Sequence, residues 1–409
     1  LLLSNNFFTD LGFEFVGPLD GHNIKELEKV FADVKKLKRP VVVHVVTKKG
    51  KGYSPAENDP ATFHGIGPFL ISDGKVEHFD TMSFTQCFSE LIVRLAEENP
   101  KICAITAAMA KGTGLDSFAR HFPDRFFDVG IAEEHAVTFA GGLACGGMIP
   151  VVAVYSTFIQ RSVDQIIHDI SLESFPVVFC LDRAGIVPND GETHQGMFDI
   201  ALFSSIPNIE ILTPATANDL KLCFEWAVSS QKCVILRYPK SACPTELNAF
   251  SQQIEYGKGI YVKNDEFAPG LSIKFDDELS LKKNNKNILF ICTGGMLSEV
   301  IQASRILMQE NIEADIYSLR FVKNFDFDDI YRFAENRDGV VLVEDGVISG
   351  GVSEKIINCF FQKKFFNVKI KAIPDDYISC GSRAEICEEI GLDPRSLAES
   401  AAALVVKNE

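Results

Sequence analysis

The sequence of 409 residues has one tryptophan, no C-x-x-C cysteine pair and no long apolar run. A membrane-spanning helix needs about 18 or more consecutive apolar residues, so the sequence predicts none, and no signal-peptide pattern is visible. The formal charge of −16 also excludes a broadly basic surface for nucleic acid or anionic lipid. We therefore expect a soluble protein with no nucleic-acid or membrane partner.

Cysteine is present, but its pattern excludes a disulfide framework. The eleven cysteines are odd in number and scattered. Several lie in apolar segments, namely Cys103, Cys180, Cys223 and Cys292. Such cysteines behave as small core residues, and free thiols persist in reducing compartments. We predict reduced core thiols and a cytoplasmic location, or a plastid in a plastid-bearing organism.

The chain is long enough for two or three domains, and its apolar segments alternate between strand and helix patterns. Such alternation predicts a parallel sheet covered by helices on both faces. We expect three parts: 1–80, 81–256 and 257–409, the last with an inserted polar loop near 261–287.

Apolar and capping patterns give the expected elements. In the first part we expect a short strand at 13–16, followed by a helix that Asn23 caps. The β-branched run 41–47 then predicts a strand buried on both faces. For the middle part we expect helices at 84–98, 132–146, 157–170 and 217–230, and strands at 102–109, 126–130, 150–156, 176–182, 210–214 and 233–239. For the last part we expect strands at 287–293, 314–322, 340–345 and 368–373 and helices at 298–310, 326–335 and 352–362.

The stretch 126–161 carries the most informative pattern. A strand runs into Gly130, and a helix then opens with Glu133 among small apolar residues. The helix that follows is nearly free of charge, so we expect it to be buried on all faces. A carboxyl in such a place is seldom unpaired, and when protonated it can donate a hydrogen bond to a cofactor. The alternative is that Glu133 and Glu134 only interact favourably with the helix dipole.

Four segments together resemble a known family. GIAEEHAVTFAGGLA, YSTFIQRSVDQIIHD, DRAGIVPNDGETHQG and RYP resemble the pyrimidine-binding domain of 1-deoxy-D-xylulose-5-phosphate synthase, in the same order and with similar spacing. The resemblance covers most of residues 10–260. It implies an α/β fold, with a transketolase-like pyrimidine-binding domain, a C-terminal α/β domain and a remnant of a diphosphate-binding domain. It also implies thiamine diphosphate with Mg²⁺, and decarboxylation of pyruvate with transfer of the two-carbon unit to glyceraldehyde 3-phosphate.

The resemblance assigns roles by position. Glu133 matches the family glutamate that bonds the cofactor aminopyrimidine, and His64 and His194 match residues that handle protons. The matched cofactor contacts are Lys49, Tyr53 and Phe158. The matched substrate contacts are Tyr155, Arg161, Arg183, Asp190, His194 and Arg237. We expect Arg183 and Arg237 to hold the aldehyde phosphate together, because guanidinium groups match phosphate oxygens.

Two departures from the family pattern qualify these expectations. Glu134 stands where the family has glutamine. No Gly-Asp-Gly sequence with an asparagine about 25–30 residues later is present, so we assign no metal ligand to this chain and expect those ligands in an N-terminal part that precedes it. We therefore expect the given chain to be folded but inactive alone, and the whole protein to be a homodimer.

Other functions remain open from the residues. One is another thiamine enzyme, either a transketolase or the β-subunit of a 2-oxo-acid dehydrogenase. A β-subunit also lacks the metal motif, but it would not carry the β-α-β pattern at 1–50. The other is a non-catalytic scaffold that kept the fold, and the presence of Glu133, Phe158, Arg183 and Arg237 argues against it. The sequence upstream of residue 1 would separate these alternatives.

Overall fold

A computed structural model describes residues 6–75, 81–267 and 286–406. The chain divides into two compact units, Leu1–Asp80 and Thr81–Glu409. Within the described residues, no helix is both long and apolar enough to cross a membrane.

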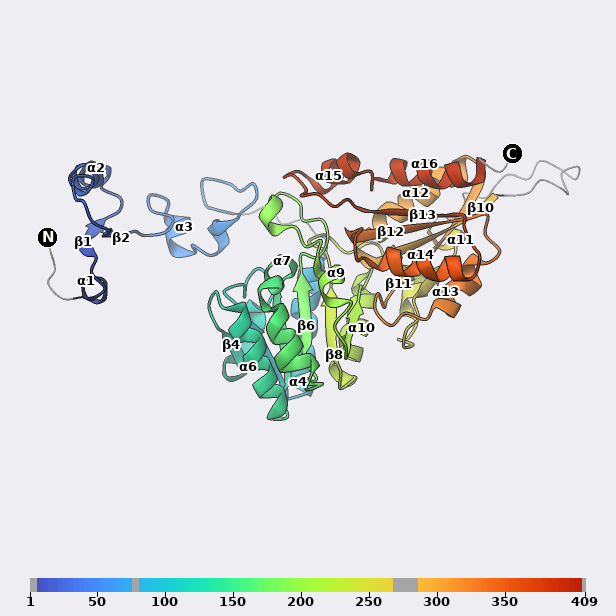
Figure 1. Cartoon of the computed structure of the whole chain (residues 1–409), viewed down its shortest axis with the longest axis horizontal. Coiled ribbons are helices and arrows are strands. Elements are labelled where there is room, and N and C mark those ends of the chain that lie inside the picture. The colour runs from blue at the N-terminus through green and yellow to red at the C-terminus, as the bar shows by residue number, and fades with distance from the viewer. Residues whose placement is uncertain (1–5, 76–80, 268–285, 407–409) are drawn as a thin grey trace, which may run out of the picture. The chain divides into compact units, whose positions relative to one another are not determined.

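The first unit is a small β-α-β arrangement (Figure 1). Strand β1 (Glu14–Asp20) pairs in parallel with β2 (Val41–Val46), and helix α2 (Ile24–Val34) connects them. The Asn23 side chain caps α2 by accepting from the Glu26 amide, as the sequence predicts. Short helices α1 (Phe7–Asp10) and α3 (Ser54–Asn58) flank this core. The expectation that 41–47 is buried on both faces is wrong, because one partner strand and one helix leave β2 half-buried or exposed along its length.

The second unit contains a six-stranded parallel sheet in the order β4-β3-β5-β6-β8-β7. Its strands are β3 (Ile102–Thr106), β4 (Phe126–Asp128), β5 (Ile149–Tyr155), β6 (Val178–Asp182), β7 (Ile209–Leu212) and β8 (Cys233–Arg237). Its helices are α4 (Phe84–Glu98), α5 (Asp116–His121), α6 (Glu133–Cys145), α7 (Ser156–Ile159), α8 (Val163–Gln165), α9 (Asp199–Phe203) and α10 (Ala217–Ser229). Parallel neighbouring strands cannot be joined by a tight turn and need a longer crossover connection, which the helical segments between these strands provide.

Alternate residues of each strand face opposite helical layers. In β5, Val152 and Val154 join the core beneath α6, whereas Val151 and Ala153 join the core beneath α4 and α10. The predicted parallel sheet with helices on both faces is therefore confirmed, although its edge strand β4 is half-buried to exposed.

The single helix expected at 157–170 is wrong in detail. The segment begins as α7, passes through a 3₁₀ turn at Gln160–Ser162 and α8, and ends as a π-helix at Ile166–Ser171. Such irregular turns re-aim side chains, and π segments are frequent at functional sites. Here the irregular start carries Phe158 and Arg161, the two residues that the sequence singled out.

A second sheet, in the order β13-β12-β10-β11-β9, forms the C-terminal part. Its strands are β9 (Ile260–Val262), β10 (Lys286–Thr293), β11 (Ile312–Leu319), β12 (Gly339–Val347) and β13 (Val368–Ile373). Its helices are α11 (Asn264–Phe267), α12 (Leu297–Gln309), α13 (Phe327–Ala334), α14 (Val352–Gln362), α15 (Arg383–Ile390) and α16 (Pro394–Val406). Helices α12 and α16 cover one face, and α13 and α14 cover the other (Figure 1).

The polar loop expected near 261–287 needs correction at its start. Strand β9 pairs antiparallel with β11 at the sheet edge, and α11 follows it. Ile260 and Val262 alternate along β9 and are both buried. Polar residues surround this short apolar pair in the sequence, so the pattern does not predict a strand there. Residues 268–285 of the expected loop lie outside the described residues.

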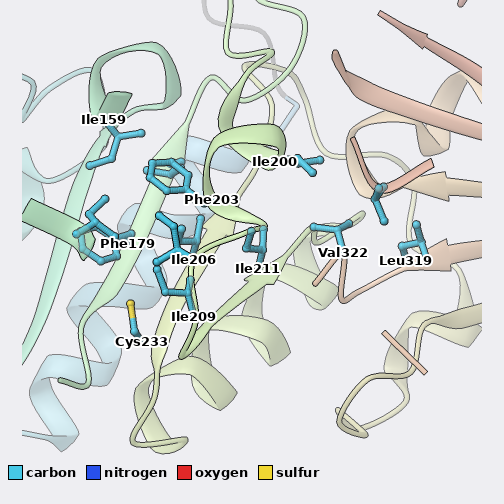
Figure 2. Close-up of a cluster of buried hydrophobic side chains, with 14 of the residues drawn as sticks. Ile159, Phe179, Ile200, Phe203, Ile206, Ile209, Ile211, Cys233, Leu319 and Val322 are labelled. Carbon is cyan, nitrogen blue, oxygen red and sulfur yellow. The ribbon is translucent and has the colours of Figure 1, made fainter. Parts of the chain in front are cut away.

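One hydrophobic core joins the two sheets of the second unit (Figure 2). It contains Phe179 and Ile211 from the first sheet together with Leu319 and Val322, on and just after β11 of the second. A short backbone bridge pairs Leu212 with Phe321 at the same place. The two sheets are therefore packed as one body rather than tethered by a linker.

Candidate active site

The candidate site lies at the carboxyl ends of the parallel strands β5, β6 and β8, where ligands bind in open α/β sheets. These strands end in Tyr155, Asp182 and Arg237. The helix that brings Glu133 to this edge starts after β4, the strand beside β3.

Glu133 is the first residue of α6, and only 2% of it is exposed. Its Oε1 accepts a hydrogen bond from Arg161 Nη1 at 2.7 Å. The Arg161 guanidinium also lies over the Phe158 ring, 5.0 Å from its centroid. A carboxyl, a cation and an aromatic face predicted from separate motifs therefore meet at one point.

Helix α6 is not buried on all faces, so that expectation is wrong. Its buried residues, which include Glu133, Ala136, Ala140 and Ala144, form one stripe. His135 and Thr138 are exposed on the opposite side. The amphipathic pattern of α6 is difficult to recognise in the sequence, because both faces carry small or weakly polar residues of similar hydropathy.

Tyr155, Phe158 and His194 form an aromatic group beside Glu133 and Arg161. The Tyr155 and Phe158 rings stack with centroids 5.8 Å apart, and the His194 ring meets Phe158 edge-on at 5.5 Å. The Thr157 hydroxyl donates to the Thr193 carbonyl oxygen, which fixes the histidine loop against α7. The structure thus brings these three residues, which the sequence assigned separately, into contact.

A basic pair flanks the same ring system. Arg183 has a left-handed backbone, with φ of 59°, and its guanidinium lies 3.9 Å from the Tyr155 ring centroid. It forms an ion pair with Asp190, and Lys240 Nζ binds the same Asp190 carboxylate at 2.6 Å. All three side chains are partly exposed. The sequence reading missed Lys240, although it follows RYP directly.

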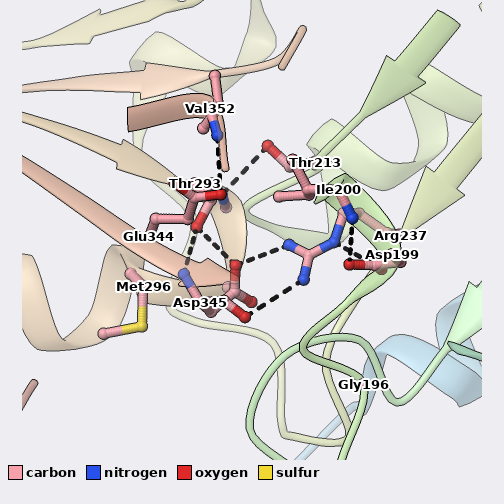
Figure 3. A network of polar contacts seen from close by, with 12 residues as sticks. Gly196, Asp199, Ile200, Thr213, Arg237, Thr293, Met296, Glu344, Asp345 and Val352 are labelled. Carbon is pink, nitrogen blue, oxygen red and sulfur yellow. Dashed lines mark hydrogen bonds and ion pairs between the residues drawn. The ribbon is translucent and has the colours of Figure 1, made fainter. Parts of the chain in front are cut away.

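Arg237 does not join Arg183, which corrects the expected pairing. Its side chain is 1% exposed and lies between two carboxylates, Asp199 at 2.8 Å and Asp345 at 2.6 Å (Figure 3). Burial alone would lower the pKa of Arg237, but the two carboxylates raise it above its ordinary value. A guanidinium satisfied and enclosed in this way has no surface to offer a phosphate.

Two further ionisable groups at this edge are perturbed by burial. Burial raises the pKa of Asp182 to about 6, while the Thr85 hydroxyl donates to its carboxylate at 2.7 Å. Burial also raises the pKa of Tyr155, and the nearby Arg183 acts in the opposite direction. Perturbed groups gathered in one place are typical of functional sites.

Lys49, Tyr53 and His64 belong to the first unit, which is described by itself. Lys49 and His64 are exposed, and the Tyr53 hydroxyl donates to the Ile71 carbonyl oxygen at 2.9 Å. The Tyr53 ring packs edge-on against Phe63. Their roles therefore remain predictions from the resemblance. In the described part of the chain, no group of three or more His, Cys, Asp or Glu residues could hold a metal ion.

Comparison with known proteins identifies three matching segments. Residues 80–245 match "Transketolase, pyrimidine binding domain", residues 277–397 match "Transketolase, C-terminal domain", and residues 1–47 match "1-deoxy-D-xylulose-5-phosphate synthase". A 1-deoxy-D-xylulose-5-phosphate synthase of Treponema pallidum (strain Nichols) is 45% identical over 408 residues, covering 98% of this chain and 61% of that protein. One from Halothermothrix orenii is 39% identical over 409 residues, covering 99% and 61%. The chain thus spans about three-fifths of the length of these relatives.

Solved structures show the same fold. A protein described as "Split gene transketolase, inactive beta4 tetramer" matches with a TM-score of 0.65 and 23% identity, covering 80% of this chain and 99% of that one. A transketolase mutant from Pichia stipitis matches with a TM-score of 0.62 and 18% identity, covering 80% and 46%. At such identity the likeness concerns the fold alone.

Proposed function

The chain belongs to the 1-deoxy-D-xylulose-5-phosphate synthase family of transketolase-like proteins, and on that premise we propose an activity for the whole protein. It decarboxylates pyruvate with thiamine diphosphate and transfers the two-carbon unit to glyceraldehyde 3-phosphate. The product is a precursor for isoprenoids, thiamine and pyridoxal. The observation that carries the proposal is the convergence of Glu133, Phe158 and the Arg183–Asp190–Lys240 cluster at one sheet edge.

The residues around Glu133 fit a thiamine pyrimidine ring. Among the described residues, Glu133 makes one hydrogen bond, to Arg161, so its second oxygen can bond a ring nitrogen. Phe158 supplies an aromatic face beside it, on which a flat heterocycle can stack. The bound cofactor supplies the nucleophilic carbon and the electron sink. The protein holds the ring, and Arg161 keeps the Glu133 carboxylate oriented.

Arg183 and Lys240 suit the phosphate of the aldehyde. Both cations now face Asp190, which holds them in place and which a dianionic phosphate could replace as their partner. Tyr155 lies under the guanidinium and fixes its plane. His194, next to Phe158, is placed to exchange a proton with the substrate oxygen.

The remaining contacts are proposed from the family. Lys49 and Tyr53 contact the cofactor diphosphate, and His64 takes part in proton transfer. Mg²⁺ is held by residues of the whole protein outside this chain. We also propose a cytoplasmic homodimer, which light scattering on the whole protein would test.

The decisive assay supplies the whole protein with pyruvate, glyceraldehyde 3-phosphate, thiamine diphosphate and Mg²⁺. Carbon dioxide release that is stoichiometric with a five-carbon ketose phosphate supports the proposal. Ketose cleavage without carbon dioxide release would indicate a transketolase instead. Transfer to a lipoyl group would indicate a 2-oxo-acid dehydrogenase subunit, and no turnover would indicate a scaffold.

A further inference from the structure

The C-terminal part of the second unit touches the loop of residues 183–198, called here the substrate loop, at three points: two on β12 and one in the connection before α15. At the loop's start, the Asp345 side chain packs so closely on Gly185 that an added Cβ there would lie 2.4 Å from Asp345 Oδ2. In its middle, the Asn189 amide donates to the Gly381 carbonyl oxygen at 2.9 Å. At its end, the Val347 amide donates to the Met197 carbonyl oxygen at 2.9 Å. Asp190 and His194 lie between these anchor points.

Hydrogen bonds also join the two ends of the loop to each other, so a contact that fixes these ends restrains the residues between them. Gly185 and Gly196 exchange two backbone hydrogen bonds, of 2.7 and 2.9 Å. The Gln195 side chain bonds both the amide and the carbonyl oxygen of Val187. A displacement at Gly185 would therefore carry Arg183 and His194 with it.

Asp345 is fixed where it meets the loop. Its Oδ1 accepts from Arg237 Nη1 at 2.6 Å and from the Thr293 hydroxyl at 2.6 Å. Arg237 in turn binds Asp199, which starts helix α9 just after the loop (Figure 3). Gly295 lets the carboxylate approach from the other side, since a Cβ there would lie 2.1 Å from Oδ2.

The charge state of Asp345 suits a permanent ion pair. Burial acts to raise its pKa, but Arg237 and the Thr293 hydroxyl outweigh burial and hold the pKa below its ordinary value. The second oxygen, Oδ2, has no hydrogen-bond partner among the described residues and faces Gly185 and Gly295. Burying an unbonded carboxylate oxygen is costly, so hydrogen bonding does not account for the close contact of Oδ2 with the loop.

We propose that Asp345 is a positioning residue of the C-terminal sheet. Through Arg237 and the Gly185 contact it holds the loop 183–198 so that Arg183, Asp190 and His194 face the phosphorylated aldehyde. This inference rests on the proposed function for its substrate, but the positioning itself does not depend on turnover.

A second buried pair across the same two sheets provides a matched control. Asp219 on α10 accepts from Arg320 Nε at 2.7 Å, and both side chains are as buried as the Arg237 pair. Arg320 also donates to the carbonyl oxygens of Gln252 and Gln253, away from the substrate loop. Asp219→Asn therefore weakens the packing of the two sheets without touching the loop.

The test compares Asp345→Asn with Asp219→Asn in the whole protein. We expect Asp345→Asn to speed amide hydrogen exchange across residues 185–198 at least about tenfold and to raise KM for glyceraldehyde 3-phosphate about tenfold, with little change in KM for pyruvate. Asp219→Asn should lower Tm without either effect. Equal loop exchange in the two variants would overturn the proposal.

Gly185→Ala alters the contact from the side of the loop, so it tests the proposal if Asp345→Asn does not fold. Its Cβ would lie 2.4 Å from Asp345 Oδ2, and because Gly185 has a φ of 69° the alanine also strains the loop backbone. It should reproduce the faster loop exchange, and unchanged exchange in this variant would overturn the proposal. An inactive parent protein would refute the proposed function, while the exchange measurements would still decide the positioning role.

Discussion

Two buried charged residues at the site illustrate opposite uses of burial. Glu133 is buried with one hydrogen bond and a half-exposed partner, so part of its bonding capacity remains for a ligand. Arg237 is buried between two carboxylates that already compensate its charge, and it has almost no exposed surface for a ligand. The sequence alone could not tell the ligand-accessible residue from the structural one. Both are charged, and both lie at the carboxyl edge of the parallel sheet, Glu133 at a helix start and Arg237 at a strand end.

Glu133→Gln in the whole protein should lower kcat at least about 10³-fold without loss of fold. The amide cannot exchange a proton with the cofactor ring, and removing a group that acts only in activation lowers the rate with little change in substrate binding. Steady-state kinetics with a thiamine diphosphate titration would check this. Glu134→Gln, an exposed neighbour, is the control and should retain most activity. Normal pyruvate consumption by the Glu133 variant would sink the assignment.

Arg183→Ala and Lys240→Ala should each raise KM for the phosphorylated aldehyde about 10–100-fold and leave KM for pyruvate nearly unchanged. A hydrogen bond to a charged group contributes about 1.5–3 kcal/mol, and about 1.4 kcal/mol corresponds to tenfold. Initial rates over a range of each substrate would measure this. A similar rise for both substrates would mean that the two cations are structural.

Arg237→Met should instead act on stability. Removing one partner of a buried ion pair leaves uncompensated charge and typically destabilises by about 3–5 kcal/mol, and here two carboxylates lose their partner. Urea denaturation of the variant beside Lys240→Met would measure it, since the partly exposed lysine should contribute less. A stable Arg237→Met protein with a raised KM for the aldehyde and unchanged amide exchange across residues 185–198 would restore the phosphate-binding interpretation, because loss of the positioning role would raise KM together with faster exchange.

Residues that the sequence could place are those whose position follows from a strand end or a helix start. Tyr155, Phe158, Arg183 and Glu133 are such cases. Lys240 and Asp345 could not be found, because their relevance depends on contacts with Asp190 and Gly185. Those contacts join strands and loops far apart in the chain, and no local pattern encodes them.

At the scale of elements, strongly periodic segments were predicted accurately. The helix expected at 84–98 is α4 (Phe84–Glu98), with Ser83 and Gln86 forming a capping box. The segment that begins at Ser156 failed as one helix, because its turns change from α to 3₁₀ to π while the residue types remain those of a helix. Strand β9 failed because three residues at a sheet edge give too short a pattern.

Glu344, in the second half of β12, gives the start of α14 a pH dependence. Its two carboxylate oxygens accept from the Val352 and Ser353 amides at 3.0 and 2.9 Å, which satisfies the first turn of the helix. Burial nevertheless raises the pKa of Glu344 from 4.5 to about 7. A raised pKa means that the folded state keeps a proton that the unfolded state has released. The stabilisation is therefore complete below about pH 4.5 and is lost as pH rises through about 7.

Glu344→Gln should remove this dependence, since the amide is neutral throughout. The free energy of unfolding of the parent relative to the variant should fall by roughly 1.4 kcal/mol per pH unit at most between pH ~5 and ~7, and then level off. Urea denaturation at four pH values would measure it, with the exposed Glu354→Gln on the same helix as control. A difference that stays constant with pH would contradict the buried neutral carboxyl.

At the scale of the whole chain, the two sheets of residues 81–409 share a core although they match two separate family domains. The sequence predicted a boundary near 257 from composition, and the structure shows a packed seam with a backbone bridge and two buried Arg–Asp pairs. Composition marks where a chain leaves one sheet. It does not reveal how tightly the next sheet packs against the first.

Residues 81–409, produced alone, should therefore unfold in one cooperative transition. The shared core contains Phe179 and Ile211 from the first sheet and Leu319 from the second, so neither sheet can lose its partner without exposing large apolar side chains. Calorimetry should give equal calorimetric and van't Hoff enthalpies, which is the mark of two-state unfolding. Asp219→Asn and Asp345→Asn should both lower the single Tm without splitting it, because each removes the charge from only one of several links across the seam. Two resolved transitions, one of them reporting residues 286–406, would show that the sheets fold independently and that the seam is only a weak docking contact.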